Sequence, residues 1–334
     1  MARREPEVKE LLDRFVTVRA VQMNSLDLAR FRFDPNLTWA VLFVNADGTV
    51  YGRYGARGRA DGSEDVSIEG FRKAAEGALE LHAGYPANRA SLAAKTGPAP
   101  RFPTPRDYPS LREYPARVDP AAGERDNPTC IHCHQVQTAE YRSFRDAGKP
   151  VPDEVLWSWP LPDALGLSLD VKERATVKSV AAGSSAARDG FRPGDALVSL
   201  DGQPLLSIAD VVWVLEHAKD GARLRTEIRR EGRAEALALS LPAGWRRNGD
   251  FSWRPALEEG FRPPFEVEGQ RIARSARPEL RVGDLIVEVD GRKTGLETPS
   301  RLLAWLLQEK RRGDKVRLVV RRGDREEAVE LPAP

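Results

Sequence analysis

The sequence has few cysteines, few methionines and no long hydrophobic run. Two cysteines in 334 residues cannot build a framework of disulfides between distant parts of a fold. No apolar run approaches the roughly 20 residues that a membrane-spanning helix needs, and residues 1–5 are not followed by the apolar core of a signal peptide. The chain as written is therefore expected to lack a transmembrane segment and to be cytoplasmic.

An excess of charge of one sign is also missing. Lysine plus arginine number 52 and aspartate plus glutamate 50, which gives a net charge of +2. A nucleic-acid partner or an anionic membrane is not expected from such a balance. The length suits about two to four domains of roughly 100 to 150 residues each.

Helix and strand patterns alternate over the first part of the chain. Residues 39–55 (WAVLFVNADGTVYGRYG) predict a hairpin, because two apolar runs flank the turn residues Asp47 and Gly48. Apolar residues on one face predict an amphipathic helix over 68–82. The segment before the hairpin predicts, in order, the end of a helix over 7–15, a strand over 15–21 (FVTVRAV) and a short helix around 26–31.

Proline punctuates the middle of the chain. Between residues 97 and 128 it recurs every few residues, so neither a helix nor a central strand can persist there. We expect a linker or an extended arm, followed by a short helix over 138–147. Beyond it, RVGDLIVEVDG (281–291) repeats RPGDALVSLDG (192–202) among short strands and glycine turns. This repeat indicates two related modules.

Residues 162–242 resemble a bacterial PDZ domain. The resemblance rests on a carboxylate-binding loop at Leu165-Gly166-Leu167, a small-residue turn and short helix at Gly183-Ser184-Ser185-Ala186-Ala187 with Gly190, and a strand start at Pro193-Gly194-Asp195. It implies that the partners are protein C-termini, whose carboxylate the loop N–H groups hold while the strand from Leu167 to Val171 pairs with the peptide. The residues implied in peptide binding are Leu165, Gly166, Leu167, Leu169, Ile208, Val212 and Leu215.

The helix SIADVVWVLEHA predicts which peptides fit. Ile208 aligns with the first groove-facing position of a PDZ helix, and Val212 and Leu215 follow one and two turns later. An apolar residue at that first position cannot hydrogen-bond a Ser or Thr near the end of the ligand, so a hydrophobic-x-hydrophobic C-terminus is expected. The last ligand side chain is expected to enter an apolar pocket formed by Leu165, Leu167, Val212 and Leu215.

Residues 257–334 are similar to a second, degenerate PDZ-like module. Gly283-Asp284 and Asp290-Gly291 are kept, but no Leu-Gly-Leu loop stands where a ligand carboxylate would bind. Bacterial PDZ domains often accompany a serine protease. The chain has no Gly-x-Ser-x-Gly or Gly-Asn-Ser-Gly-Gly stretch, so a protease is not expected.

Residues 5–83 resemble the later part of a thioredoxin-like domain. The match lies in the helix end at 6–8, the strand at 15–18 and the hairpin turn at 47–48. Thr38 or Trp39 stands where such domains usually have a cis-proline. Together with the PDZ repeat, the order resembles a bacterial family of thioredoxin-like/PDZ proteins, some of which are selenoproteins. That resemblance implies a Cys-x-x-Cys or Sec-x-x-Cys motif and a signal peptide upstream of Met1, and a location in the periplasm or cell envelope.

Residues 127–136 (NPTCIHCHQV) hold both cysteines in a Cys-x-x-Cys-His spacing. This is the spacing of covalent haem c attachment, in which Cys130 and Cys133 bind the haem and His134 ligates the iron. Candidates for the sixth ligand are Met23, His82 and His217. The alternatives are a redox dithiol, a zinc site that has only three ligands even with His132 or His134, and inert cysteines.

These patterns predict an α+β multidomain protein. Its expected parts are a partial thioredoxin-like α/β domain (1–96), a Pro-rich linker with the Cys-x-x-Cys-His segment (97–161), a PDZ domain (162–242) and a degenerate PDZ-like domain (257–334). The predicted function is a PDZ-mediated, protein-binding scaffold of the cell envelope that carries a haem c or redox centre. The alternative is a thiol- or selenol-disulfide oxidoreductase whose catalytic motif lies upstream of a truncated start.

Overall fold

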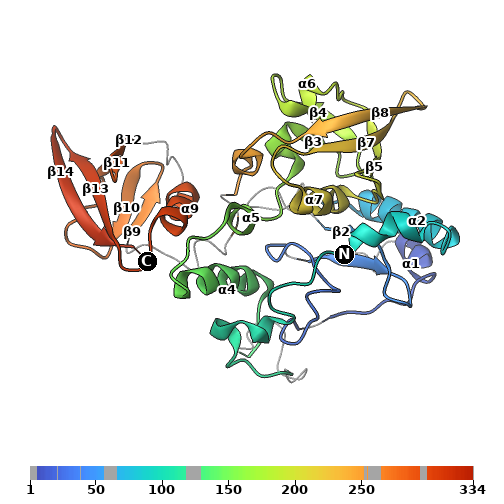
Figure 1. Cartoon of the computed structure of the whole chain (residues 1–334), viewed down its shortest axis with the longest axis horizontal. Helices are drawn as coiled ribbons and strands as arrows, with labels where there is room; N and C mark the ends of the chain where they lie inside the picture. Colours follow the sequence, from blue (N-terminus) through green and yellow to red (C-terminus); the bar gives the residue numbers. More distant parts are fainter. Residues whose placement is uncertain are drawn as a thin grey trace.

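A computed structural model of the chain describes residues 6–20, 22–37, 39–55, 66–117, 129–251, 254, 265–293 and 299–333. Two β-rich modules lie at opposite sides of the molecule, and helix α4 (Cys133–Asp146) runs between them (Figure 1). Within the described ranges, no helix combines the length and the apolar character that crossing a bilayer requires. The architecture is mixed α and β, as the helix and strand patterns along the sequence predict.

The N-terminal unit, defined as the described part of residues 6–96, packs a hairpin against helices. Its elements are α1 (Pro6–Leu12), β1 (Val41–Val44), β2 (Val50–Tyr54), α2 (Ile68–Ala83) and α3 (Arg89–Leu92). β1 and β2 are antiparallel, and Gly48 adopts a φ of 88° in the turn between them. Phe71 and Ala74 of α2 are buried with Phe43 of β1. The predicted hairpin and the predicted helix over 68–82 are confirmed.

The strand predicted over residues 15–21 is wrong for its described part. Residues 16–20 form no regular element, and the side chains of Val16 and Val18 are 94% and 87% exposed. A strand needs a neighbour for its N–H and C=O groups, and among the described residues β1 and β2 pair only with each other. Residue 21 and Thr38 lie outside the described ranges, whereas Trp39 is half-exposed.

The helix predicted around residues 26–31 is also wrong. These residues form turns, because the Asp27 side chain accepts hydrogen bonds from the N–H groups of Ala29 and Arg30 and offers the backbone a local alternative to a helix. The Pro-rich segment forms two short 3-10 turns, Pro105–Asp107 and Pro109–Leu111. Residues 118–128 lie outside the described ranges.

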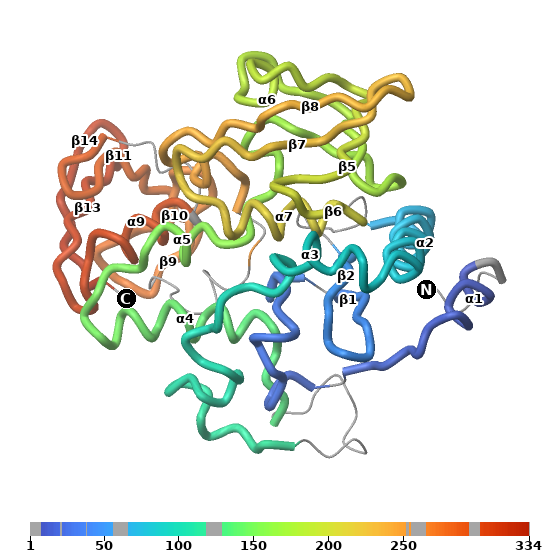
Figure 2. The backbone as a smooth tube through the Cα atoms, turned by 45° about the vertical axis from the view of Figure 1, so that its right-hand side comes forward, coloured from blue at the N-terminus to red at the C-terminus, as the bar shows by residue number. Residues whose placement is uncertain are grey.

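The first β module contains the strand, the short helix and the longer helix that were predicted for residues 162–242. Its elements are a 3-10 turn (Pro162–Leu165), β3 (Leu167–Leu169), β4 (Val177–Val180), α6 (Ser185–Arg188), β5 (Ala196–Leu200), β6 (Gln203–Pro204), α7 (Ile208–His217), β7 (Arg223–Arg230) and β8 (Arg233–Ser240). β3 and β4 form a two-stranded sheet, and the other strands form a sheet in the order β6-β5-β7-β8. α7 packs between this module and the N-terminal unit, with β2 directly beside it, and α3 contacts β6 (Figure 2).

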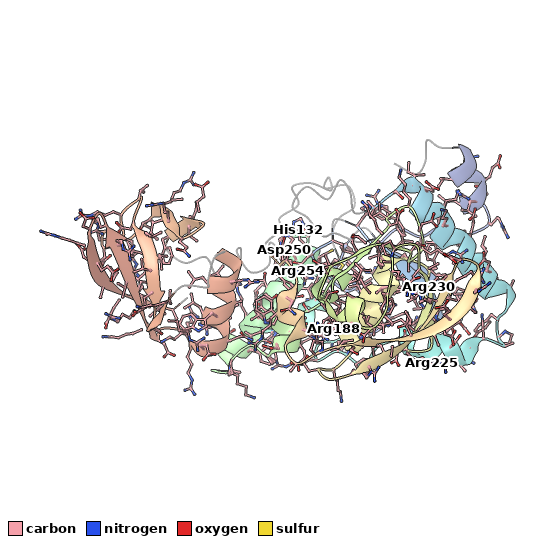
Figure 3. All side chains as sticks on the ribbon, turned by 90° about the horizontal axis from the view of Figure 1, so that it is seen from above. His132, Arg188, Arg225, Arg230, Asp250 and Arg254 are labelled. Carbon is pink, nitrogen blue, oxygen red and sulfur yellow. The ribbon has the colours of Figure 1, made fainter. Side chains whose placement is uncertain are left out.

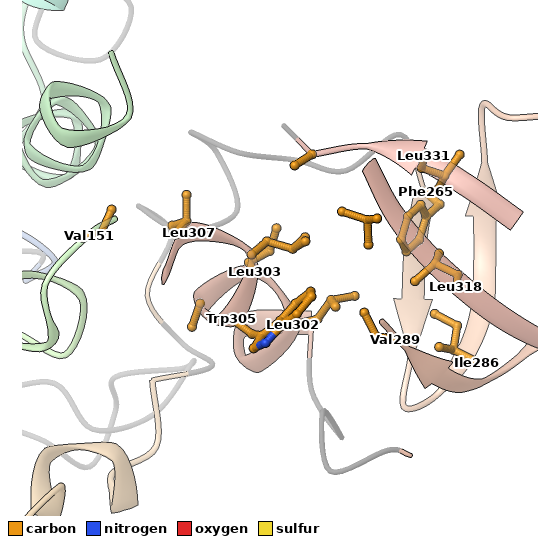
Figure 4. Close-up of a cluster of buried hydrophobic side chains, with 14 of the residues drawn as sticks. Val151, Phe265, Ile286, Val289, Leu302, Leu303, Trp305, Leu307, Leu318 and Leu331 are labelled. Carbon is orange, nitrogen blue, oxygen red and sulfur yellow. The ribbon is translucent and has the colours of Figure 1, made fainter. Parts of the chain in front are cut away.

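The second β module repeats that order without the short helix. Its elements are β9 (Phe265–Glu268), β10 (Arg271–Ser275), β11 (Leu285–Val289), β12 (Arg292–Lys293), α9 (Pro299–Glu309), β13 (Lys315–Arg322) and β14 (Arg325–Pro332). The strand order is β14-β13-β11-β10-β9. One face of α9 packs on the sheet, and Leu307 lies on the side that faces Val151 of the linker (Figure 4). The short helix α5 (Asp153–Leu156) leads from this contact to the first module.

Candidate peptide-binding site

Strand β3 is an edge strand whose free side faces α7. Gly166 O accepts from Ala181 N–H at 2.9 Å, and Asp170 N–H donates to Thr176 O at 2.8 Å, so both groups point toward β4. Backbone groups alternate in direction along a strand, and those of Leu167 and Leu169 therefore point to the opposite side. No other strand among the described residues pairs there. This side can accept an added strand.

The loop before β3 depends on glycine at position 166. Gly166 has a φ of +85°, and a Cβ atom at this position would lie 2.2 Å from Cβ of Ser184. A side chain is thus excluded both by backbone conformation and by space. Gly166 N–H donates to Asp163 O at 2.8 Å and closes the turn that leads into Leu167.

The other residues predicted to bind peptide gather in one apolar cluster. Leu165, Leu167, Leu169, Val212 and Leu215 are all buried in the core of the first module, where they pack on one another. Ile208 at the start of α7 is half-buried and packs against the same cluster. The structure therefore brings the residues from β3 and from α7 into one buried cluster.

A small pocket lies next to Val212, on the side of the N-terminal unit. Sequence reasoning missed the residues that form it with α7: Phe33, Leu37, Tyr54, Trp159 and Leu161. Trp159 and Leu161 directly precede the loop, and the aromatic pair Trp157 and Trp159 was the signal that could have found them. The pocket combines residues of two units, which only folding brings together.

The segment before the loop is anchored by a buried carboxylate. Glu216 of α7 accepts hydrogen bonds from Trp159 N–H at 2.6 Å and from Arg246 Nη1 at 3.2 Å. Burial raises the pKa of Glu216, and the positive charge of Arg246 opposes this shift. Arg246 also donates to the carbonyls of Leu215 and Ala218 and so caps the end of α7.

A second buried charge cluster joins α7 to the N-terminal unit. Asp210 is fully buried and lies 2.9 Å from Nζ of Lys95, which is also buried. Asp210 further accepts from the N–H groups of Arg53 and Leu206. The Arg53 guanidinium lies 3.6 Å from the centre of the Trp213 ring. Burial lowers the pKa of Lys95, and the Asp210 carboxylate acts in the opposite direction.

The Cys-x-x-Cys-His segment packs in a different buried cluster from the residues of this site. Both thiols are free, and Cys133 is the first residue of α4, which begins five residues before the predicted helix. Burial raises the pKa of the Cys133 thiol, which disfavours the thiolate that redox chemistry and metal binding require. His132 lies apart from Arg225 and Arg230 of the first module (Figure 3).

The ligand candidates around the cysteines have other contacts. The ring centres of His132 and His134 are 5.7 Å apart. Met23 is buried with Ile131, although its cluster does contact Cys133. The two remaining candidates are engaged elsewhere: His82 Nδ1 hydrogen-bonds Tyr51 Oη, and His217 Nδ1 hydrogen-bonds the carbonyl of Trp213. In the described part of the chain, three or more His, Cys, Asp or Glu side chains do not gather as a metal would need.

Comparison with known proteins identifies the first module. A PDZ domain family model matches residues 176–230, so the chain contains a PDZ domain. A probable periplasmic serine endoprotease DegP-like of Pseudomonas savastanoi pv. phaseolicola is 28% identical over 131 residues, which cover 38% of this chain and 27% of the relative. The DegP-like protein of Pseudomonas putida F1 is 34% identical over 80 residues, or 24% of this chain and 17% of the relative.

Among solved structures, an HtrA-type protease, AlgW with a decapeptide, matches 28% of this chain and 26% of its own, with 21% identity and a TM-score of 0.20. The chain thus spans about a quarter of the length of these relatives, or less. Their endoprotease activity is a property of those longer proteins.

The predicted function is wrong in assigning a haem c or redox centre to the protein. The Pseudomonas relatives reported above are named as probable periplasmic serine endoproteases, DegP-like, and not as haem proteins or thiol oxidoreductases. The same finding overturns the alternative of a thiol- or selenol-disulfide oxidoreductase. The PDZ part of the resemblance is confirmed.

Proposed function

We propose that this protein binds the C-terminal ends of other proteins through its PDZ domain, residues 162–242. The observation that carries the proposal is the edge of β3, whose free backbone groups at Leu167 and Leu169 face α7 next to a loop that requires glycine. An extended peptide adds to such an edge as a further antiparallel strand. The N–H group of Leu167, which points away from β4 just after this loop, then holds the terminal carboxylate.

The side chains around β3 favour an apolar ligand end. Val212 and Leu215 lie beside Leu165 and Leu167 in one cluster, so the last ligand side chain must enter by displacing contacts within this cluster or through the adjoining pocket. Ile208 at the start of α7 carries no hydrogen-bonding group. A Ser or Thr facing it would lose its water without gaining a partner, at a cost of roughly 1 to 3 kcal/mol. A hydrophobic-x-hydrophobic C-terminus is the proposed ligand.

We place this activity in the periplasm or cell envelope, because the relatives that match the PDZ domain are named as periplasmic proteins. The N-terminal unit is proposed to be the later part of a thioredoxin-like fold. The succession of a helix, an antiparallel hairpin and a second helix supports this proposal. Its role here is structural: it covers the outer face of α7.

The first prediction concerns peptide binding by the full-length chain. A labelled peptide with a hydrophobic-x-hydrophobic C-terminus should bind with micromolar affinity at best. Amidation of its carboxylate should weaken binding at least about tenfold because it removes the charged contact, and Gly166→Ala should do so because the added Cβ displaces the loop. Fluorescence anisotropy measures this.

Gly232→Ala is the matched control for the loop variant. Gly232 also has a positive φ, +80°, but lies in the β7–β8 turn with nothing within 4 Å of the added Cβ. Its affinity should remain within about twofold of the wild type. Equal affinity for amidated and free peptides, or a preference for Ser or Thr at the third-last position in a C-terminal peptide array, refutes the proposal.

A further inference from the structure

The far end of the groove between β3 and α7 is closed by helix α2. Val171 is the second residue after β3, and its carbonyl accepts a hydrogen bond of 2.8 Å from Oγ of Ser67. Ser67 is the N-cap of α2 and holds the N–H of Gly70 with the same Oγ, at 2.9 Å. The N-terminus of α2 is thus joined directly to the end of the strand that would pair with a ligand.

Glycine at position 70 permits this contact. A Cβ atom there would lie 2.1 Å from the carbonyl oxygen of Val171. Tyr54 supports the same corner, since its Oη donates to Ser67 O at 2.6 Å and accepts from Ser67 N–H at 3.0 Å. The space that remains at this end of the groove is a small pocket, which Tyr54 and Val171 line together with Ile208.

Ion pairs fasten α2 to the turn between β3 and β4. Lys73 Nζ lies 2.5 Å from Oε1 of Glu173. Arg174 makes a two-pronged contact with Glu80, at 2.7 and 2.9 Å, and its Nε donates to the carbonyl of Lys73 at 3.0 Å. A bidentate pair of this kind fixes geometry as well as charge. These contacts hold the N-terminus of α2 in place over Val171.

We propose that the N-terminus of α2 is a stop that restricts recognition to the last three or four residues of a ligand. The proposal rests on the proposed function. In an antiparallel pair, successive ligand residues that bond to β3 are two apart. The last ligand residue lies beside Leu167 and the third-last beside Leu169. The fifth-last residue reaches Val171, where Ser67 and Gly70 already lie. A longer ligand must leave the groove at this point.

A series of peptides tests the stop in the full-length chain. Peptides of four and eight residues share one hydrophobic-x-hydrophobic C-terminus, and their affinities are measured by competition. In the wild type, the eight-residue peptide should bind within about twofold of the four-residue peptide. In the double charge reversal Lys73→Glu with Arg174→Glu, repulsion from Glu173 and Glu80 releases α2, and the eight-residue peptide should gain about fivefold or more, the worth of one added hydrogen bond.

The matched control is Lys315→Glu with Arg317→Glu on β13, which reverses two exposed ion pairs of the second module. Its affinities for the four- and eight-residue peptides should equal those of the wild type. A gain of fivefold or more with length in the wild type overturns the stop, and so does the absence of any gain in the released variant while the four-residue peptide still binds. If no peptide binds to the wild type or to the double charge-reversal variant, the result refutes instead the proposed function on which the stop depends.

Discussion

At the residue scale, the repeated Gly-Asp motif builds the same ion pair in both β modules. The Asp195 carboxylate accepts two hydrogen bonds of 2.7 Å from Arg230, and the Asp284 carboxylate accepts hydrogen bonds of 2.9 and 2.7 Å from Arg322. Hydrogen bonds from Arg322 lower the pKa of Asp284. Burial acts to raise the pKa of Asp195, but hydrogen bonds and positive charge from Arg230 and Arg192 together outweigh it, so the pKa is lowered as well.

These pKa shifts predict how acid affects the second module. A carboxyl with a lowered pKa in the folded chain stabilises the fold above its unfolded pKa of about 4, and this contribution is lost as the pH falls through the lower folded value. Asp284→Asn should therefore reduce the free energy of unfolding by about 1 to 3 kcal/mol near neutral pH, and the difference from the wild type should shrink below about pH 4. Urea titrations at a series of pH values measure it.

Asp324→Asn serves as the control, because Asp324 is exposed in the turn between β13 and β14. It should leave the free energy of unfolding unchanged. A destabilisation by Asp284→Asn that is the same in acid as at neutral pH would contradict the assignment of this ion pair.

At the element scale, α7 is buried on both sides. Its central residues Val211, Trp213 and Leu215 are all at most 1% exposed. One side belongs to the PDZ core and the other meets the N-terminal unit, where Trp213 Nε1 donates to Ala94 O at 3.0 Å. Apolar residues on both sides of a helix are typical of such a position, and the charged residues Asp210 and Glu216 of α7 are buried in ion pairs. The buried ion pair of Lys95 and Asp210 lies on this second side.

Removal of Lys95 should therefore loosen the N-terminal unit from α7. Lys95→Met leaves Asp210 charged and buried without its ion-pair partner, which typically costs about 3 to 5 kcal/mol. We expect a lower free energy of unfolding and faster proteolysis of the N-terminal unit. Lys73→Met, whose partner Glu173 is partly exposed, should cost less than about 1 kcal/mol. Equal losses of unfolding free energy in the two variants would show that the buried ion pair contributes no more to stability than the partly exposed one.

At the scale of the whole molecule, the second module is tied to the linker rather than to the peptide site. Val151 N–H donates to Leu307 O at 3.2 Å, and Leu156 and Trp157 belong to the same buried cluster as α9. Figure 4 shows Val151 beside Leu307 on the far side of α9 from its sheet. The residues proposed to hold peptide lie in the other cluster, which the PDZ domain forms together with Trp159 and Trp245.

A substitution in the second module should therefore lower the free energy of unfolding without weakening peptide binding. Leu307→Ala creates a cavity at a fully buried position and should reduce the free energy of unfolding by about 2 to 5 kcal/mol. Affinity for a hydrophobic-x-hydrophobic peptide should stay within about twofold of the wild type at temperatures where the variant is folded. A loss of tenfold or more under those conditions would mean that the second module contributes to the ligand site.

Local patterns predicted the elements whose partners are close in sequence. The hairpin over 39–55 and the helix over 68–82 are confirmed because a turn residue, Gly48, and a one-sided apolar face specify them locally. The strand over 15–21 is wrong in its described part because a strand requires a neighbour that no local pattern supplies. The haem c or redox function predicted from the Cys-x-x-Cys-His spacing is wrong for a similar reason, since the spacing carries no information about the burial of Cys133.

The sequence by itself determined that a PDZ domain is present and where its loop, edge strand and helix lie, because glycine positions and alternating apolar residues act within short segments. Only the tertiary structure decided what surrounds that groove. Ser67, Gly70 and Tyr54 lie a hundred residues or more before Val171 and Ile208, and nothing in their own segment indicates that they meet there. Such contacts depend on how two units pack, which is a property of whole surfaces rather than of any local pattern.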